Sequence, residues 1–287
     1  MSTPMTTSAA IQPVGLDLDA HPVAFVGTGS MARAIALGIY RASPAQAARI
    51  ACTRRDVAAL DDLAALGMVT SSDNAVAIAG AEIVVLAVKP QVYDDVLEAC
   101  RNAFRPGQVL VSVLAGIPTA ALERRVPEGV RVIRAMPNTP ALIGQGVTGL
   151  CAGASAGPTE LDLASRLFGT VGEVITIDEA QMDALTATSG SGPAYLFYLA
   201  ELMMAGAHEL GLPPETADAL VRGTLSGAAA LLAQSPYSPE TLRARVTSPG
   251  GTTARAIDVF DAAGLRLTVA RAMAAAERRA AELAHGQ

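Results

Sequence analysis

The sequence predicts an α/β protein in which a doubly wound, mostly parallel sheet is followed by an all-helical domain. Up to about residue 178, short apolar runs alternate with amphipathic stretches, as strands alternate with crossover helices. Beyond that point four long helical stretches follow, at about 179–189, 193–210, 214–234 and 252–284. A length of 287 residues with 51% hydrophobic content is enough for two domains with cores of their own.

The predicted domain limits are 21–178 for the sheet domain and 179–287 for the helical domain. Residues 1–20 are small and polar and do not have the pattern of a secretory signal, so we expect a disordered tail. The most apolar helical segment, 194–210, is interrupted by Glu201, His208 and Glu209 and is short for a membrane span. We therefore expect a soluble, cytoplasmic protein.

Composition limits the possible partners. The net charge is -6, only 17% of residues are charged, and there is no basic run, so neither nucleic acid nor an anionic membrane is favoured. The three cysteines and three histidines lack the spacing of metal ligands, and we expect no metal site. Small molecules and further copies of the chain are the expected partners.

The first strand, over Val23–Val26, runs directly into two glycines and then a helix. Gly27 allows a tight turn, Gly29 lets a phosphate approach the backbone, and the following helix N-terminus offers unpaired N–H groups to an anion. We expect this turn to bind the pyrophosphate of a dinucleotide. The candidate residues are Gly27, Thr28, Gly29, Ser30 and Met31.

The second strand, within residues 48–55, ends in Thr53, Arg54 and Arg55. An NAD-binding domain usually has a carboxylate at this position for the ribose 2'-hydroxyl, whereas arginine accepts a 2'-phosphate. The sequence therefore favours NADPH, with NADH possible. The alternative is that both arginines only solvate the start of the predicted helix at 56–66, where cations are disfavoured by the helix dipole.

Two later strand ends supply further cofactor candidates. The apolar strand over 81–88 ends at Lys89 and Pro90, and the backbone of Ala87, Val88, Lys89 and Pro90 is expected to border the cofactor, because ligands bind at the carboxyl ends of such strands. The strand over 130–135 leads into a segment fixed by two prolines, in which Met136 and Asn138 are candidates. A rigid turn without a ligand would explain this second segment equally well.

Other strands are expected at 109–113, 145–151 and 171–177, with helices reaching about 104, at 118–125 and at 158–168. The later helices, at 193–210 and 214–234, are apolar on most faces. A helix of that kind must be buried on all sides, and about a hundred residues cannot do this alone, so a second copy of the chain is expected to cover them.

Two loops interrupt the helical domain, at 189–195 and at 246–253. The second opens a helix with successive N–H groups and hydroxyls, which can cradle a carboxylate without any formal charge. Its candidate residues are Ser248, Gly250, Gly251, Thr252 and Thr253. The alternative is an elaborate helix cap, for which one serine or threonine would normally suffice.

The chain resembles the pyrroline-5-carboxylate reductase family in five motifs that occur in family order. These are Gly27–Ala32, Ala87–Gln91, Ala135–Pro140, Ser189–Tyr195 and Ser248–Thr253. The resemblance implies an N-terminal Rossmann domain and a C-terminal helical domain that interleaves with a second subunit, with five dimers forming a decamer in several members. It also implies that Ser248–Thr253 holds a proline or pyrroline carboxylate, that Thr253 reaches the ring nitrogen, and that Asn74 lies near the adenine ribose.

The implied activity is reduction of 1-pyrroline-5-carboxylate to L-proline, the last step of proline biosynthesis. Alternatives are a reductase of a related cyclic imine, such as 1-piperideine-2-carboxylate, and a non-catalytic NADPH-binding protein. A 3-hydroxyacid dehydrogenase would need a lysine in the helical domain, but Lys89 is the single lysine of the sequence.

Overall fold

The computed structural model describes residues 17 and 20–284, which form two compact units. The sheet unit runs to Gly190 and includes 278–284, and the helical unit comprises Ser191–Glu277. The tail expected at 1–20 lies almost wholly outside the described residues. Residues 179–190, which the sequence places in the helical domain, belong by their contacts to the sheet unit.

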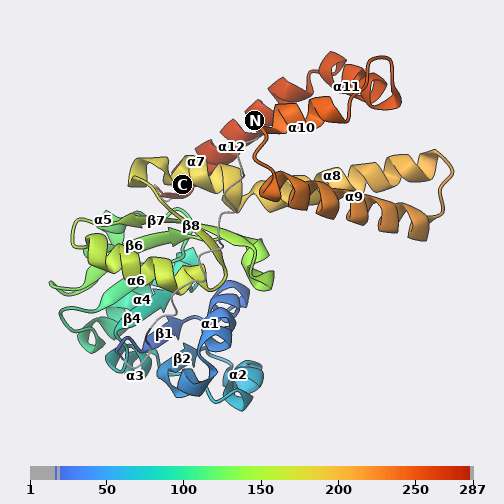
Figure 1. Cartoon of the computed structure of the whole chain (residues 1–287). Helices are drawn as coiled ribbons and strands as arrows, with labels where there is room; N and C mark the ends of the chain where they lie inside the picture. Colours follow the sequence, from blue (N-terminus) through green and yellow to red (C-terminus); the bar gives the residue numbers. More distant parts are fainter. Residues whose placement is uncertain (1–16, 18–19, 285–287) are drawn as a thin grey trace, which may run out of the picture. The chain divides into compact units, whose positions relative to one another are not determined.

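The sheet unit contains an eight-stranded sheet of order β3-β2-β1-β4-β5-β6-β7-β8 (Figure 1). The strands are β1 (Val23–Val26), β2 (Ile50–Thr53), β3 (Val69–Ser71), β4 (Ile83–Leu86), β5 (Val109–Ser112), β6 (Arg131–Met136), β7 (Gly146–Ala152) and β8 (Gly172–Thr176). All pairs are parallel except β6 and β7. The predicted fold class is therefore confirmed, while β3 is a strand that the sequence did not indicate.

Helices connect the strands of the sheet unit. The α-helices are α1 (Ser30–Ala42), α2 (Asp61–Ala65), α3 (Asn74–Ala79), α4 (Tyr93–Cys100), α5 (Thr119–Glu123), α6 (Pro158–Gly169) and α7 (Met182–Leu185). Short 3₁₀ turns are η1 (Pro44–Arg49), η2 (Val57–Leu60), η3 (Pro90–Val92), η4 (Arg101–Ala103), η5 (Thr139–Ile143) and η6 (Glu179–Gln181), and η7 (Thr186–Gly190) is a π-helix.

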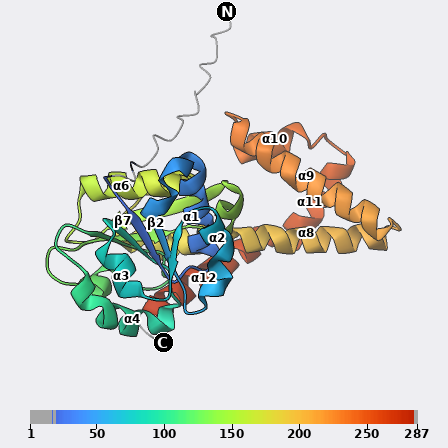
Figure 2. The same cartoon turned by 90° about the horizontal axis from the view of Figure 1, so that it is seen from below.

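Both faces of the sheet are buried, because successive strand residues point to opposite sides. Val23 and Phe25 pack with α1, α2 and α6 in one core cluster. Ala24 and Val26 pack with α3, α4 and α5 in the other. Figure 2 shows α6 on one side of the sheet and α3 and α4 on the other. This explains why the strands read as continuous apolar runs and not as alternating patterns.

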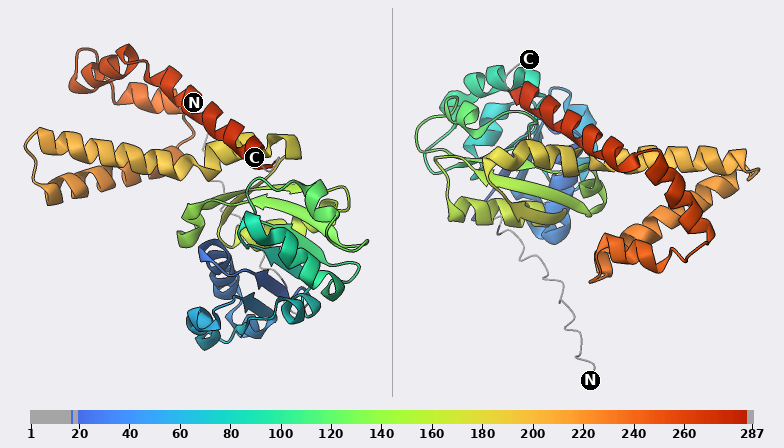
Figure 3. Two further views of the ribbon diagram at one scale, coloured as in Figure 1. Left: turned by 180° about the vertical axis from the view of Figure 1, so that it is seen from behind. Right: turned by 90° about the horizontal axis from the view of Figure 1, so that it is seen from above.

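The helical unit has no strands among its described residues. Its helices are α8 (Gly192–Glu209), α9 (Pro214–Gln234), α10 (Pro239–Arg245), α11 (Thr252–Ala262) and α12 (Leu265–Ala284), whose last residues belong to the sheet unit. Figures 1 and 3 show α8 and α9 side by side. The single helical stretch expected at 252–284 is wrong, because Gly264 has a φ of 72° and ends it between α11 and α12. Helix α10 was not predicted.

The large apolar side chains of α8 are exposed in the single chain. Phe197 is 67% exposed, Tyr198 60% and Leu196 56%. In α9, only Ala217 and Val221 are buried among the described residues. Of the helices that the structure describes, none is long and apolar enough to cross a membrane.

Candidate functional site

The glycine turn after β1 has the geometry that an anion site needs. Gly27 has a φ of 86°, and a Cβ there would lie 2.6 Å from Cγ1 of Val88 and 2.9 Å from its backbone. Gly29 is the N-cap of α1, and a Cβ there would meet nothing within 4 Å. No described side chain caps this helix, and no acidic residue lies in its first turn. The N–H groups of Gly27, Thr28 and Gly29 bond within the protein, so the N–H groups open to a phosphate are those at the start of α1.

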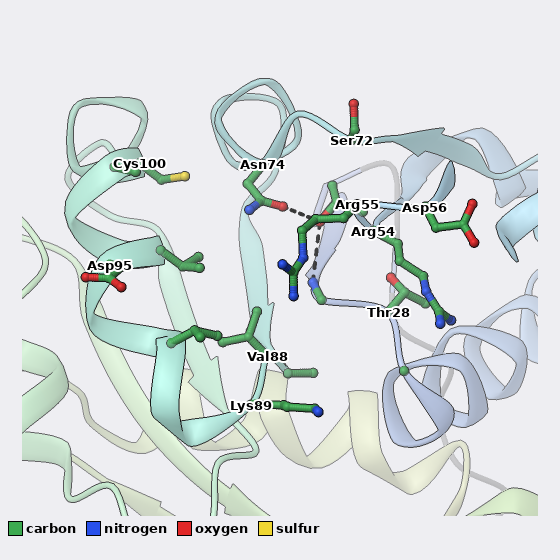
Figure 4. Close-up of a pocket in the computed structure, with 17 residues that line it drawn as sticks. Thr28, Arg54, Arg55, Asp56, Ser72, Asn74, Val88, Lys89, Asp95 and Cys100 are labelled. Carbon is green, nitrogen blue, oxygen red and sulfur yellow. Dashed lines mark hydrogen bonds between the residues drawn. The ribbon is translucent and has the colours of Figure 1, made fainter. Parts of the chain in front are cut away.

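A pocket of about 660 Å³ lies at this turn. Its walls come from the carboxyl ends of three neighbouring strands, since Val26 of β1 is in register with Thr53 of β2 and Leu86 of β4. The predicted cofactor residues that line it are Gly27, Thr28, Gly29, Thr53, Arg54, Arg55, Asn74, Ala87, Val88 and Lys89. Figure 4 shows Arg54, Arg55 and Asp56 in one loop, with Asp95 and Cys100 on a helix at the other side.

Hydrogen bonds fix the floor of the pocket around Thr53, which is fully buried. Its hydroxyl donates to Oδ1 of Asn74 over 2.5 Å and accepts from the backbone N–H of Gly27 over 3.4 Å. Its carbonyl accepts from the N–H of Thr28 over 2.8 Å. One side chain therefore ties the glycine turn, the end of β2 and the start of α3 together, which orders the pocket before any ligand enters.

Arg54 and Arg55, with Lys89, are the cationic residues of the pocket lining. Neither guanidinium forms an ion pair with an acidic residue of the described chain. Two unpaired cations at the end of β2 suit a ribose 2'-phosphate, which arginine binds with its planar fork of donors. Asp56 also lines the pocket and brings a carboxylate beside this pair.

Sequence reasoning missed one whole wall of the pocket. This wall is formed by Val92, Asp95, Val96, Ala99 and Cys100 from η3 and α4, and Asp56 and Ser72, elsewhere in the lining, were not predicted either. Burial raises the pKa of the Cys100 thiol, so this residue presents an uncharged surface to the pocket. The amphipathic pattern that follows Lys89-Pro90 could have indicated this wall. It predicts a helix directly after β4, and the carboxyl end of β4 borders the pocket.

Other predicted cofactor residues lie outside the pocket lining. Ser30 starts α1, Met31 packs against the apolar core, and Pro90 starts η3. Met136 ends β6. Asn138 is only 8% exposed, and both ends of its amide bond to the protein itself, as described below.

The predicted substrate loop lies in the helical unit. Helix α11 begins at Thr252 with Gly251 as its N-cap, so Thr253 occupies the first turn as expected. The N–H of Gly251, which the sequence offers to a carboxylate, instead donates to the Ser248 carbonyl over 3.0 Å. Among the described residues, no acceptor bonds to the N–H of Gly250, Thr252 or Thr253. These amides, and not that of Gly251, are the candidates for an anion.

No group of three or more histidine, cysteine or acidic residues in the described part of the chain is arranged to hold a metal ion. The parallel sheet, the uncapped helix at a glycine turn and the arginine pair together define a nucleotide-dependent oxidoreductase of the Rossmann type. The cofactor that these residues fit is NAD(P)H.

Comparison with known proteins identifies the family. Residues 22–116 match the model described as NADP oxidoreductase coenzyme F420-dependent, and residues 179–283 match pyrroline-5-carboxylate reductase dimerisation. A pyrroline-5-carboxylate reductase of Pseudomonas aeruginosa is 44% identical over 91% of this chain and 96% of its own length. The chain belongs to the pyrroline-5-carboxylate reductase family.

Solved structures agree over the same extent. The pyrroline-5-carboxylate reductase of Coxiella burnetii is 37% identical with a TM-score of 0.85, covering 92% of this chain and 98% of its own. The pyrroline carboxylate reductase of Plasmodium falciparum, determined with NADP bound, is 26% identical with a TM-score of 0.81, over 92% and 98% of the two chains. The expected fold, family and cofactor class are thereby confirmed.

Proposed function

We propose that the protein reduces 1-pyrroline-5-carboxylate to L-proline, the last step of proline biosynthesis, with NADPH as its preferred cofactor. The observation that carries the reaction is the 44% identity to a pyrroline-5-carboxylate reductase over 91% of the chain. The preference for NADPH rests on Arg54 and Arg55, which line the pocket without a carboxylate partner among the described residues. Asp56 lines the same pocket, and a carboxylate at this place is typical of NAD-binding domains, so weaker use of NADH is part of the proposal.

The residues of the glycine turn and the end of β2 would hold the cofactor. The N–H groups at the start of α1 would receive the pyrophosphate, and Arg54 and Arg55 the 2'-phosphate. When bound, NADPH would supply the hydride that adds to the imine carbon, C2 of 1-pyrroline-5-carboxylate, which becomes C5 of proline. The roles of Ser30, Met31, Pro90 and Met136 as cofactor contacts remain part of this proposal.

The helical unit would hold the substrate through the loop Ser248–Thr253. The open amides of Gly250 and Thr252 can bind the carboxylate, while the Thr253 hydroxyl contacts the ring nitrogen. That hydroxyl can donate to a neutral imine or accept from a protonated one. The reaction consumes one hydride and one proton and turns the C=N bond into a secondary amine, so the protein chiefly needs to orient the ring and exclude water.

The protein is further proposed to act as a homodimer through its helical domain, with a decamer of five dimers as a larger form. The match of 179–283 to a dimerisation model and the exposed apolar side chains of α8 support the dimer. The expectation of a decamer rests on the family resemblance alone.

The test is oxidation of NADPH, followed at its absorbance band, on addition of synthetic 1-pyrroline-5-carboxylate, with proline identified by mass spectrometry. Six-membered imines are assayed in parallel, and faster turnover of one of them would reassign the substrate. Tight NADPH binding without turnover of any imine would support the non-catalytic alternative.

A further inference from the structure

The segment Thr186–Gly190 is a π-helix, and its place in the function is not explained by the pocket or by the substrate loop. Three hydroxyls bond back to the carbonyls four residues earlier: Thr186 to Met182 over 2.8 Å, Thr188 to Ala184 over 2.8 Å and Ser189 to Leu185 over 3.3 Å. Each hydroxyl bonds the carbonyl that its own N–H would bond in an α-helix, whereas a π-helix moves that N–H to the fifth residue back. The sequence Thr-Ala-Thr-Ser thus favours the widened turn.

The last turn of this π-helix is held from the carboxyl end of β6. Asn138 donates from Nδ2 to the Ser189 carbonyl over 3.2 Å and accepts at Oδ1 from the N–H of Val147 over 2.9 Å. A backbone carbonyl requires a donor and a backbone N–H requires an acceptor, so the two bonds fix the orientation of the amide. Next to it, a Cβ on Gly190 would lie 2.9 Å from Cε of Met136.

The other end of the segment is anchored separately. The N–H and the hydroxyl of Thr119 donate to the Glu179 carboxylate over 2.7 and 2.6 Å. Arg134, also on β6 and with a side chain only 5% exposed, lies 3.5 Å from the same carboxylate and 3.9 Å from that of Asp183. Losing the Asn138 contact would therefore free the last turn without detaching the segment.

We propose that Asn138 is a positioning residue, which holds the last turn of the π-helix against β6 and so sets where the motif Ser189–Tyr195 begins. Both halves of its amide already have a partner in the chain, and the residue is only 8% exposed, which disfavours direct contact with the cofactor. Ligands of a parallel sheet bind at the carboxyl ends of its strands, where this contact lies. Loss of the contact should then lower kcat and leave NADPH affinity unchanged. The kinetic part rests on the proposed function.

The test compares Asn138→Asp with Asn102→Asp, which makes the same change at an exposed site. At residue 138 the carboxylate keeps an acceptor for Val147 but sets a second acceptor against the Ser189 carbonyl. We expect amide hydrogen exchange over 186–191 to accelerate about tenfold or more, as for a lost buried hydrogen bond, and kcat to fall by a similar factor. The Kd of NADPH should stay within about twofold of the unchanged protein, since the pocket residues are intact.

A large rise in the Kd of NADPH with unchanged exchange would make Asn138 a cofactor ligand and overturn the proposal. Unchanged exchange with any change in kcat would overturn it as well. If Asn138→Asp does not fold, Asn138→Ser, which carries no charge and is too short to keep both bonds, replaces it, and the same pattern is expected. Exchange and NADPH binding are measured without substrate, so a failure of the proposed reaction is distinguished from a failure of this proposal.

Discussion

Arg54 and Arg55 are expected to decide the choice of cofactor. Replacing both with alanine removes two charge-assisted donors for a 2'-phosphate and leaves the glycine turn intact. The KM for NADPH should rise by about tenfold or more, while the KM for NADH should change little. Arg41→Ala, at an exposed position of α1, is the control. Equal changes for both cofactors would remove the arginine pair from the phosphate site.

Thr253 is expected to matter for turnover and not for folding. Alanine at this position removes one hydroxyl and keeps the backbone amides of α11. The expected loss in kcat/KM is roughly ten- to a hundredfold, on the order of 1 to 3 kcal/mol, with unchanged NADPH affinity. Thr247→Ala is a matched control, because the Thr247 hydroxyl bonds the Arg243 carbonyl in the preceding helix. Full activity of Thr253→Ala, or loss only by unfolding, would leave the helix-cap alternative standing.

The sequence predicted where the site residues lie along the sheet better than it predicted their hydrogen-bond partners. Thr53, Arg54 and Arg55 could be placed in the pocket because the end of a buried strand fixes their position along the sheet. The sequence placed Asn138 at a strand end equally well. It could not show that Val147 and Ser189, distant along the chain, would use both halves of its amide. Strand ends are encoded locally, whereas hydrogen-bond partners depend on the tertiary fold.

The helices and strands also differ in how well the sequence predicted them. The four-residue strands β1, β4 and β5 are apolar runs buried on both faces, which made them recognisable. Strand β3 has three residues, Val69–Ser71, and none of them is fully buried, so its sequence carries little strand signal. The break at Gly264 was hidden by the helix-forming residues around it. The pocket wall from α4 escaped prediction because the amphipathic pattern after Lys89-Pro90 indicates a helix but not which of its side chains face the pocket.

The contact between α1 and the turn that joins α6 to β8 depends on Gly38. A Cβ there would lie 2.4 Å from Cγ1 of Val171 and 2.9 Å from Oγ1 of Thr170. Alanine normally stabilises a helix relative to glycine, but here the crowding should outweigh that gain. We expect Gly38→Ala to lower the free energy of unfolding by about 1 to 3 kcal/mol in denaturant titrations. The exposed substitution Arg41→Ala in the same helix should change it by less than about 0.5 kcal/mol. A stabilised Gly38→Ala protein would contradict this packing.

The whole molecule is expected to be built from dimers, because α8 exposes several neighbouring large apolar side chains in the single chain, and an exposed apolar patch marks an interaction surface. Light scattering at micromolar concentration should therefore give an even multiple of the 29.2 kDa chain mass. Phe197 is 67% exposed in one chain. Phe197→Glu would place a charge inside the proposed interface and should lower the mass toward that of one chain and reduce turnover.

Val69→Glu is the matched control for Phe197→Glu, since Val69 is 50% exposed and belongs to the sheet unit and not to the helices proposed to pair. It should leave the mass unchanged. A substituted monomer that keeps NADPH binding but loses turnover would indicate that pairing completes the substrate site, since the glycine turn and the arginine pair lie within one sheet unit. A native chain that is monodisperse at 29.2 kDa, or a Phe197→Glu protein that keeps its mass, would exclude these helices as the interface.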